Sequence, residues 1–323
     1  MGALQLSVVV PVHNAEAYLR TCLDSLLAQT RPIDEIVVVD DGSTDGSSGI
    51  LEEYARRHGS IRVLRGPQRG AAGARNAGLD AVSGDWIGFV DADDWIEPQM
   101  YDELLRAAVA QDLDIALCNG RYHYEGRKPD QPIYTDTPLV GPCSGAQWYI
   151  SKVENRTLLH YVFVHLYRRA FIDRHRLRFI EGLMHEDVTW TTRALLLAER
   201  VAYDNSPHYV YRRQPRHFTR KALDDRLVNV IRGAKEDARI LADMAAQVRD
   251  ARLARALRWQ LVDGGLSVFH KIRKLSNSAI RAEQSRNVLR EGYLGLLRRN
   301  ATEFRQRRKI AKHFLWAWLL SMR

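Results

Sequence analysis

Short apolar runs recur along the first 120 residues, separated by segments whose apolar residues are spaced as on one side of a helix. Runs without polar alternation are typical of strands buried on both faces of a sheet. The strands are expected at residues 6–11, 36–39, 61–64, 86–90 and 114–118, and the intervening helices at residues 18–27, 71–78 and 98–110, the first capped by Asn14. Strands that alternate with helices predict an α/β fold, Rossmann-like, in which helices cover both faces of a mainly parallel sheet.

Polar residues follow three of the expected strands at the points where the apolar runs end. These are Pro11 to Asn14, Asp40 to Asp45 and Asp91 to Asp94. In open parallel sheets, ligands bind beyond the carboxyl ends of the strands. The three polar segments are therefore expected to converge on one edge of the sheet.

Asp91 and Asp93 place two carboxylates one residue apart just beyond a strand. Carboxylate oxygens suit a hard divalent cation, which in phosphate chemistry is commonly shared with substrate phosphates. An isolated Asp-x-Asp is more often an acidic turn before a helix, so the pair alone does not decide. Its convergence with the other polar segments favours an enzyme that acts on a nucleotide diphosphate.

Asp40 and Asp41 are adjacent acids at a strand end, and Arg75 lies near the start of a glycine-punctuated helix. A turn with a helix cap uses only one of two adjacent acids, which leaves the other to accept hydrogen bonds from a base or ribose. The Arg75 guanidinium could face a pyrophosphate or an acidic loop. The alternative for Arg75 is a solvated surface position.

Composition sets the broad class of the molecule. With 323 residues, 46% hydrophobic and 27% charged, the chain is expected to form one large or two small globular domains. The three cysteines show neither metal-ligand spacing nor a disulfide framework, which indicates a reducing, cytoplasmic compartment. No signal peptide is apparent at the N-terminus, and no apolar stretch reaches the roughly 18 residues needed to span a bilayer.

Positive charge is concentrated in the last hundred residues, where helical spacing also dominates. Residues 1–220 carry 25 Lys and Arg against 29 Asp and Glu, whereas residues 221–323 carry 23 against 10. A cationic block at residues 305–312 precedes seven apolar residues at 314–320 that include two tryptophans. This combination favours a helix lying in an anionic membrane interface. The alternative is a C-terminal helix docked on the core or on a partner.

Four segments of the chain resemble, in order and spacing, the inverting family-2 glycosyltransferases with a GT-A fold. These segments are Ser7–Asn14, Val37–Asp45, Gly73–Gly78 and Asp91–Asp93. The resemblance implies a nucleotide-sugar donor, with Asp93 ligating Mg²⁺ or Mn²⁺ and Asp91 facing ribose or a metal-bound water. It also implies that the nucleoside and its diphosphate are bound by Pro11, Asn14, Asp40, Asp41 and Arg75.

The resemblance continues, more weakly, to about residue 220. Glu186 and Asp187 precede a helical pattern, and taken alone they could simply stabilise a helix N-terminus. In the bacterial polysaccharide members of the family, a Glu-Asp pair at this distance supplies the general base, which implies that Asp187 is the base and Glu186 its neighbour. Arg212, Arg213 and His217 are possible contacts to the departing diphosphate, although a solvated His217 is the simpler interpretation.

Together these observations predict two regions, a GT-A domain over residues 1–220 and a basic helical region over residues 221–323. The GT-A domain would have a donor half to about residue 118 and an acceptor half beyond it. The expected activity is metal-dependent, inverting transfer of a sugar, with a UDP-sugar the expected donor. A saccharide acceptor on lipopolysaccharide core or a lipid-linked glycan would place the protein peripherally on the inner face of the cytoplasmic membrane.

Other functions are open at this stage. One is capsule or exopolysaccharide glycosyl transfer, and another is a non-catalytic nucleotide-sugar-binding scaffold, although both Asp93 and Asp187 are present. A pI of about 9.6 suggests nucleic acid, but no helix-turn-helix, zinc-finger or aromatic ribonucleoprotein signature accompanies it, so no nucleic-acid partner is expected. A nucleotidyltransferase would need a glycine-rich triphosphate loop, which we do not find.

Overall fold

The computed structural model describes residues 4–126, 128–136, 141–213 and 219–321. The chain divides into two compact units. The first unit comprises Met1–Gly182 and Trp190–Pro215, and the second comprises Leu183–Thr189 and Arg216–Arg323. A short loop before residue 190 thus belongs to the C-terminal helical unit, although it is far from that unit in sequence.

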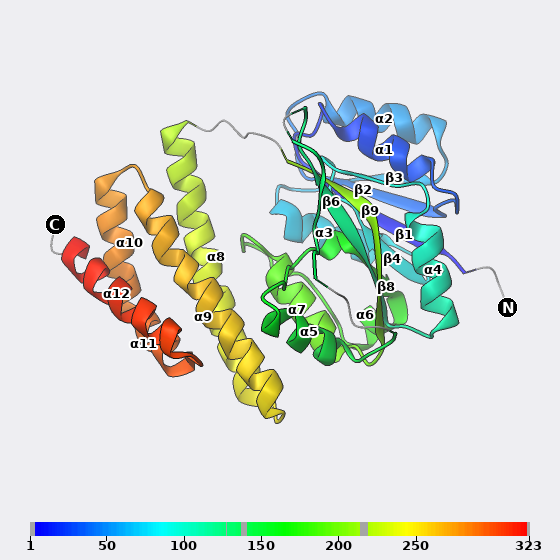
Figure 1. The fold of residues 1–323 in the computed structure, drawn as a ribbon. Coiled ribbons are helices and arrows are strands. Elements are labelled where there is room, and N and C mark those ends of the chain that lie inside the picture. Colours follow the sequence, from blue (N-terminus) through cyan, green and yellow to red (C-terminus); the bar gives the residue numbers. More distant parts are fainter. Residues whose placement is uncertain (1–3, 127, 137–140, 214–218, 322–323) are drawn as a thin grey trace. The chain divides into compact units, whose positions relative to one another are not determined.

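The first unit alternates strands and helices, coloured from blue to green in Figure 1. It begins with β1 (Leu6–Val12), α1 (Leu19–Leu27), β2 (Glu35–Asp40), α2 (Ser47–Arg57), β3 (Ile61–Arg65), α3 (Gly70–Ala81), β4 (Trp86–Phe89), β5 (Trp95–Ile96), α4 (Met100–Ala110) and β6 (Ile115–His123). Beyond these follow β7 (Gln131–Pro132), α5 (Gly145–Glu154), the 3-10 turn η1 (Val162–Val164), β8 (His165–Arg168), α6 (Arg169–Arg174), α7 (Asp187–Leu197) and β9 (Val201–Arg212).

The strands form one sheet in the order β3-β2-β1-β4-β8-β6-β9-β5, with β7 paired to β6. The first four are parallel, which confirms the predicted α/β architecture. β6 and β9 also pair in parallel, so the sheet is mainly parallel as predicted, with antiparallel pairings where β8 meets β4 and β6 and where β5 meets β9. A parallel neighbour needs a long crossover. Because β8 is antiparallel to β4, it needs no such crossover: the chain enters this strand directly from η1 and runs in the opposite direction to β4.

Both faces of the sheet are buried, which explains the uninterrupted apolar runs. On one face Val8 and Val10 of β1 join a core with residues of α1, α2 and α4. On the other face α3 approaches β1 so closely that a Cβ on Gly78 would lie 2.3 Å from a methyl carbon of Val9. Phe89, Phe179 and Trp190 pack as an aromatic cluster with centroids 4.0 to 5.9 Å apart.

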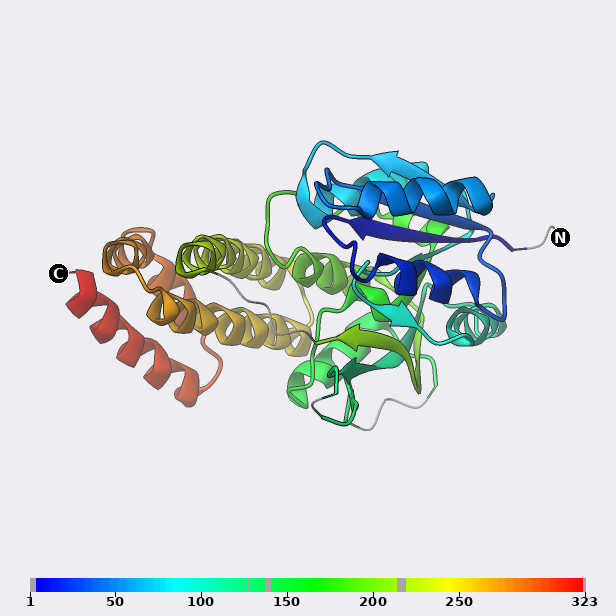
Figure 2. The same cartoon turned by 90° about the horizontal axis from the view of Figure 1, so that it is seen from above.

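The second unit is helical, as the apolar spacing beyond residue 220 predicts, and Figure 2 shows its helices from above. It contains α8 (Arg220–Gln247), α9 (Ala251–Lys274), α10 (Ser278–Arg290), α11 (Tyr293–Asn300) and α12 (Phe304–Ser321). Side chains of Thr219, Asp250 and Asn277 accept backbone hydrogen bonds at the starts of α8, α9 and α10, so three helices are capped at the N-terminus. Among the described residues, none of the helices has the length and apolar content that crossing a bilayer requires.

Candidate active site

Three polar loops follow β1, β2 and β4, which are neighbours and parallel in the sheet. Val12 is in register with Asp40, and the Asp41 N–H donates to the Val12 carbonyl at 2.8 Å. The Val90 N–H donates to the carbonyl of Val9, so β4 ends at the same level. The polar segments therefore share the carboxyl edge of the sheet, hereafter the donor edge.

Asp40 and Asp41 fix the shape of this edge through hydrogen bonds from their own chain. Asp41 accepts the N–H groups of Arg69 and Gly70 at 2.9 and 2.6 Å, at the start of α3. Asp40 accepts the N–H of Ser43 and the hydroxyl of Ser48. Burial raises the pKa of Asp40, but these hydrogen bonds outweigh it and the pKa is lowered. Both carboxylates anchor the loops around them, and a carboxylate has further lone pairs that can accept from a ligand.

Asn14 does not cap the first helix, contrary to the prediction. Helix α1 begins at Leu19, and no side chain caps it. Asn14 adopts a left-handed backbone with φ of 52°, and its side-chain oxygen accepts the N–H of Thr44 at 2.8 Å. The amide thus ties the loop after β1 to the loop after β2, which is a donor-edge position. Pro11 lies in β1 opposite Val39.

Arg75 is buried in α3 and reaches the acidic turn after β4. Its Nη2 donates to Oδ1 of Asp91 at 2.6 Å, and its guanidinium lies 5.5 Å from the ring centroid of Phe179. The side chain is only 5% exposed, so the interpretation of a solvated surface arginine is wrong. Arg75 neutralises Asp91 and orients it at the donor edge.

Asp94 is a part of this turn for which the sequence indicates no role. It is 1% exposed, and it accepts the hydroxyl of Tyr209 at 2.7 Å and the N–H of Arg212 at 2.8 Å. Burial and the neighbouring Asp93 and Asp91 hold the pKa of Asp94 well above its usual range. Because Tyr209 and Arg212 lie on β9, Asp94 fastens the turn to that strand. Only the tyrosine alternation of β9 signals this in the sequence.

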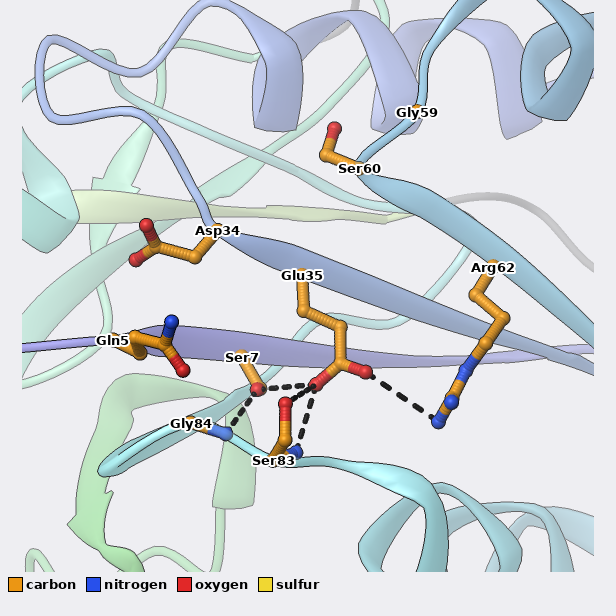
Figure 3. Close-up of a pocket in the computed structure, with 9 residues that line it drawn as sticks. All are labelled: Gln5, Ser7, Asp34, Glu35, Gly59, Ser60, Arg62, Ser83 and Gly84. Atoms are coloured by element: carbon orange, nitrogen blue, oxygen red, sulfur yellow. Dashed lines mark hydrogen bonds and ion pairs between the residues drawn. The ribbon is translucent and has the colours of Figure 1, made fainter.

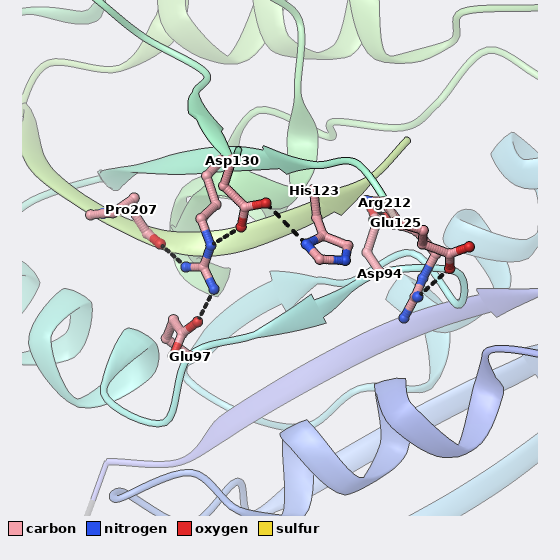
Figure 4. Close-up of polar contacts among 8 residues, drawn as sticks. Asp94, Glu97, His123, Glu125, Asp130, Pro207 and Arg212 are labelled. Atoms are coloured by element: carbon pink, nitrogen blue, oxygen red, sulfur yellow. Dashed lines mark hydrogen bonds and ion pairs between the residues drawn. The ribbon is translucent and has the colours of Figure 1, made fainter. Parts of the chain in front are cut away.

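Arg212 lies beside the predicted metal ligand, Asp93. Its Nε donates to the carbonyl of Asp93 at 3.0 Å, and its guanidinium lies 4.5 Å from the ring centroid of Trp95. Its Nη1 pairs with Glu125 at 2.8 Å (Figure 4). Arg213 instead covers the rings of two tyrosines, Tyr122 and Tyr211. The two arginines therefore have different surroundings, and Arg212 is the one at the acidic turn. His217 lies outside the described residues.

The side chains of Asp91 and Asp93 fit a divalent cation by their chemistry. Both residues are only partly buried, and both supply carboxylate oxygens, which Mg²⁺ and Mn²⁺ prefer. Arg75 donates to Oδ1 of Asp91 and so fixes the orientation of this carboxylate. The role of Asp93 as the principal ligand stays a prediction.

A second group of ligand-type side chains lies between α4 and β9. Atoms of Glu103, Asp204 and His208 lie within 4.8 Å of one another, and Nε2 of His208 is 2.9 Å from Glu103. The spacing of these residues in the sequence does not reveal the group, because α4 and β9 are about a hundred residues apart. Hydrogen bonding within the group accounts for its compactness.

The opposite, amino-terminal edge of the sheet also carries a polar pocket, of about 260 Å³ (Figure 3). Its central acid, Glu35, accepts hydrogen bonds from Ser7 and Ser83 and faces Arg62 at 3.4 Å. These contacts satisfy the carboxylate without leaving paired acids or an exposed ligand set. The donor edge is therefore the better candidate for an active site.

Glu186 and Asp187 belong to the second unit, whereas the other described candidate residues belong to the first. Asp187 begins α7, whose residues from Trp190 are part of the first unit. The preceding His185 has a left-handed backbone with φ of 67°, and Val188 donates to its carbonyl. Such strained backbone is enriched at functional sites.

Comparison with known proteins places this geometry in context. The chain is 38% identical over 209 residues to YibD of Escherichia coli strain K12, an uncharacterized glycosyltransferase, covering 64% of this chain and 61% of that protein. It is 34% identical over 227 residues to EpsJ of Bacillus subtilis strain 168, covering 69% and 66%. The chain therefore spans less than two thirds of the length of these relatives.

Two solved structures share the fold. S. aureus TarS residues 1–349 in complex with UDP-GlcNAc gives a TM-score of 0.59 at 19% identity, over 97% of this chain and 90% of that one. The mannosyltransferase PcManGT from Pyrobaculum calidifontis, in complex with GDP-Man and Mn²⁺, gives 0.55 at 15% identity, over 98% and 88%. The profile of Glycosyl transferase family 2 matches residues 7–174, and the chain belongs to that family.

Proposed function

We propose that the chain transfers a sugar from a nucleoside-diphosphate sugar to a saccharide acceptor, with inversion at the anomeric carbon. The observation that carries this proposal is the donor edge, where Arg75 holds Asp91 and Arg212 lies against Asp93. The family membership supports it. A UDP-sugar is the proposed donor, because TarS, which shares the fold, was solved with UDP-GlcNAc.

We propose Mg²⁺ or Mn²⁺ as the cofactor, held by Asp93 with Asp91 beside it. When bound, the cation would neutralise negative charge on the departing diphosphate. Arg212 contributes a fixed positive charge at the same turn. Asp94 holds β9 at this turn by accepting hydrogen bonds from the Tyr209 hydroxyl and the Arg212 N–H. Arg213 and His217 remain proposed diphosphate contacts.

We assign the donor, the acceptor and the helical region to successive parts of the chain. Residues 1–118 bind the donor, residues 119–220 bind the acceptor, and residues 221–323 form the basic helical region. Asp187 accepts the proton of the acceptor hydroxyl as that oxygen attacks the anomeric carbon, while the bond to the diphosphate breaks. General-base assistance of this kind contributes about 10²–10⁴-fold. Glu186 is the neighbouring carboxylate.

The test is nucleotide release from a panel of nucleotide sugars, measured with and without acceptor. Acceptor-dependent release of UDP with an inverted product is expected. The variant Asp187→Asn nearly preserves shape and should keep donor affinity while turnover falls. A product with retained configuration would contradict single displacement, and full turnover by the variant would remove Asp187 as the base.

We further propose that the protein binds the inner face of the cytoplasmic membrane through α12 and acts on a glycolipid, such as lipopolysaccharide core or a lipid-linked glycan. The inner side of α12 packs within the second unit, where His313 stacks on Phe269 at 4.7 Å and Ile310 is buried. This inner side of α12 is therefore docked on the other helices of the second unit. The outer side exposes four large apolar residues to 43–57%, namely Phe314, Leu315, Trp318 and Leu319.

These apolar residues follow a cationic turn of the same helix that includes Arg308 and Lys312. Apolar burial and attraction to anionic headgroups act together on such a helix. Replacing the four outer residues by serine should weaken sedimentation with anionic phosphatidylglycerol vesicles and leave transfer to a soluble acceptor unchanged. Val109→Ser, which alters an apolar residue 50% exposed in the first unit, is the control. Unchanged vesicle binding would contradict the proposal.

A further inference from the structure

Arg212 is a cation whose position is fixed by the residues around it. Its Nε donates to the carbonyl of Asp93, and its guanidinium lies over the rings of Tyr18 and Trp95, 5.1 and 4.5 Å from their centroids. The side chain is only 12% exposed. Arg212 therefore presents a positive charge at the acidic turn in one orientation, and little side-chain freedom remains to be lost when an anion binds.

Glu125 is paired with this guanidinium but is far more exposed. Its Oε1 lies 2.8 Å from Nη1 of Arg212 (Figure 4), and 51% of its side chain is exposed. Glu125 lies two residues beyond the end of β6, before Gly126, which has a left-handed backbone with φ of 64°. Ion pairs that are open to water on one side contribute little net stability. The arginine is thus held by the fold, whereas the glutamate can leave at small cost.

Other contacts hold the chain on both sides of Glu125. Asp130 accepts from Nε of Arg121 at 2.9 Å and lies 3.0 Å from the ring of His123. These contacts do not use the pair of Glu125 with Arg212, so the fold keeps Glu125 near the guanidinium whether or not the pair is formed. A tethered group of this kind acts at a high effective concentration.

A phosphate group and a carboxylate use the same N–H groups of an arginine. The planar guanidinium matches both, often with two parallel hydrogen bonds, and a diphosphate carries more negative charge than a single carboxylate. A diphosphate bound at the acidic turn would therefore compete with Glu125 for Arg212.

We propose that Glu125 is an intramolecular competitor of the substrate diphosphate. It pairs with Arg212 in the free protein, is displaced when the nucleoside diphosphate binds, and returns as the nucleotide leaves. This inference rests on the proposed function, in which the donor binds at the acidic turn. Glu125 then weakens the binding of the donor and of the released nucleotide, and it speeds release of the product.

The experiment measures the Kd of UDP and of GDP by titration calorimetry with Mn²⁺ on the full chain, and compares variants on the nucleotide that wild type binds. Glu125→Gln should bind it about two- to fivefold more tightly, which is the range that corresponds to an exposed ion pair. Glu125→Asp keeps the charge but is one methylene shorter, so it should tighten binding nearly as much. Wild-type affinity in Glu125→Asp would overturn displacement and assign the effect of glutamine to charge repulsion alone.

A double-mutant cycle tests whether the effect passes through Arg212. In an Arg212→Gln background, Glu125→Gln should leave the Kd unchanged, because the glutamate no longer has a guanidinium to occupy. Tightening that persists in this background would overturn the proposal. The Glu125→Asp comparison decides the same point if the Arg212→Gln protein fails to fold.

Arg168 and Asp112 form a matched control pair. The Arg168 guanidinium lies 5.1 Å from the ring centroid of Trp86 and pairs at 2.6 Å with Asp112, which is 81% exposed. Arg168 is in register with Trp86 at the start of β4, so this pair lies at the opposite edge of the sheet from the acidic turn. Asp112→Asn should therefore leave the nucleotide Kd unchanged.

The outcomes separate this inference from the proposed function. Equal nucleotide affinity in wild type and Glu125→Gln would overturn the role of Glu125 and leave the donor proposal standing. If neither protein binds UDP, GDP or inorganic pyrophosphate, the donor proposal fails, and the role of Glu125 fails with it.

Discussion

Asp94 and Asp237 are two buried aspartates, one in each unit, and burial raises the pKa of both. They differ in their hydrogen bonds. Asp94 accepts from Tyr209 and from the Arg212 backbone, whereas Oδ1 of Asp237 has no partner among the described residues. The first carboxyl group is embedded in a completed network, and the second is left incomplete beside a loop of proposed function.

The difference shows two uses of a buried acid. A satisfied acid such as Asp94 joins strands to a turn, and removing it leaves unpaired donors behind. An unsatisfied one such as Asp237 reduces stability, which natural sequences tolerate mainly at functional positions. Substitutions at the two sites should therefore have opposite effects on stability.

The largest effect is expected at the donor edge, which the Asp94 network holds in place. Asp93→Ala should lower turnover by about 10³-fold, because its carboxylate is the principal proposed ligand of a cation that neutralises the leaving diphosphate. Chelation of divalent ions should have a comparable effect on wild type, measured as UDP release. Asp80→Ala, at an exposed acid of the same unit, is the control. Turnover that persists in chelator would contradict the metal assignment.

The next effect tests the completed network. Asp94→Ala should lower the free energy of unfolding by about 1–3 kcal/mol, because the Tyr209 hydroxyl and the Arg212 N–H lose their acceptor in a buried place. Tyr209→Phe removes one donor and should cost about 1 kcal/mol. Denaturant unfolding measures both values. A neutral Asp94→Ala would show that the turn does not depend on this network.

Replacing Asp237, whose hydrogen bonding is incomplete, should raise stability rather than lower it. The folded pKa of Asp237 is raised, so its contribution to stability is fully present below about pH 4 and is lost as pH rises toward 8. Asp237→Asn cannot ionise, and its melting temperature should exceed that of wild type by a few degrees at pH 8, since about 1 kcal/mol corresponds to roughly 2–4 °C. The gap should shrink as pH falls toward 4. A constant gap would exclude titration of Asp237 as its cause.

Much of the fold follows from the sequence, because β1, β2 and β4 are apolar runs long enough to show their burial. Strand β8 escapes prediction: four residues, His165–Arg168, are too few to establish a period, and their antiparallel direction depends on partners distant in sequence. Asn14 misleads for a related reason, since its amide bonds to Thr44 rather than to the next helix. The residues around Asn14 do not show whether its amide will bond to the backbone of the next helix or to Thr44.

In the candidate site too, some residues can be predicted from the sequence and others cannot. Asp91, Asp93 and Arg75 stand out by motif, and Arg75 does meet Asp91. Asp237 is indistinguishable in the sequence from other acids of α8, because what sets it apart is the packing of a loop some fifty residues earlier against Gly233. Chemistry carried by a local motif can be predicted from the chain, whereas chemistry created by tertiary packing cannot.

The smallest effect concerns that packing, and it compares two glycines inside long helices of the second unit. A Cβ on Gly233 would meet the Met184 carbonyl, whereas a Cβ on Gly264 of α9 would meet nothing within 4 Å. Gly264→Ala should stabilise the protein by up to about 1 kcal/mol through helix propensity. Gly233→Ala gains the same propensity but must push backbone away, so it should come out neutral to destabilising by about 1–2 kcal/mol.

The two alanines separate stability from placement of the proposed base. Because the displaced group in Gly233→Ala is the backbone just before His185, kcat should fall in this variant, while Gly264→Ala keeps wild-type kcat. Denaturant unfolding and turnover are measured on both proteins under the same conditions. If Gly233→Ala retains full turnover, the loop does not need its contact with α8 to act. A fall in kcat confined to Gly233→Ala would instead tie the helical unit to catalysis.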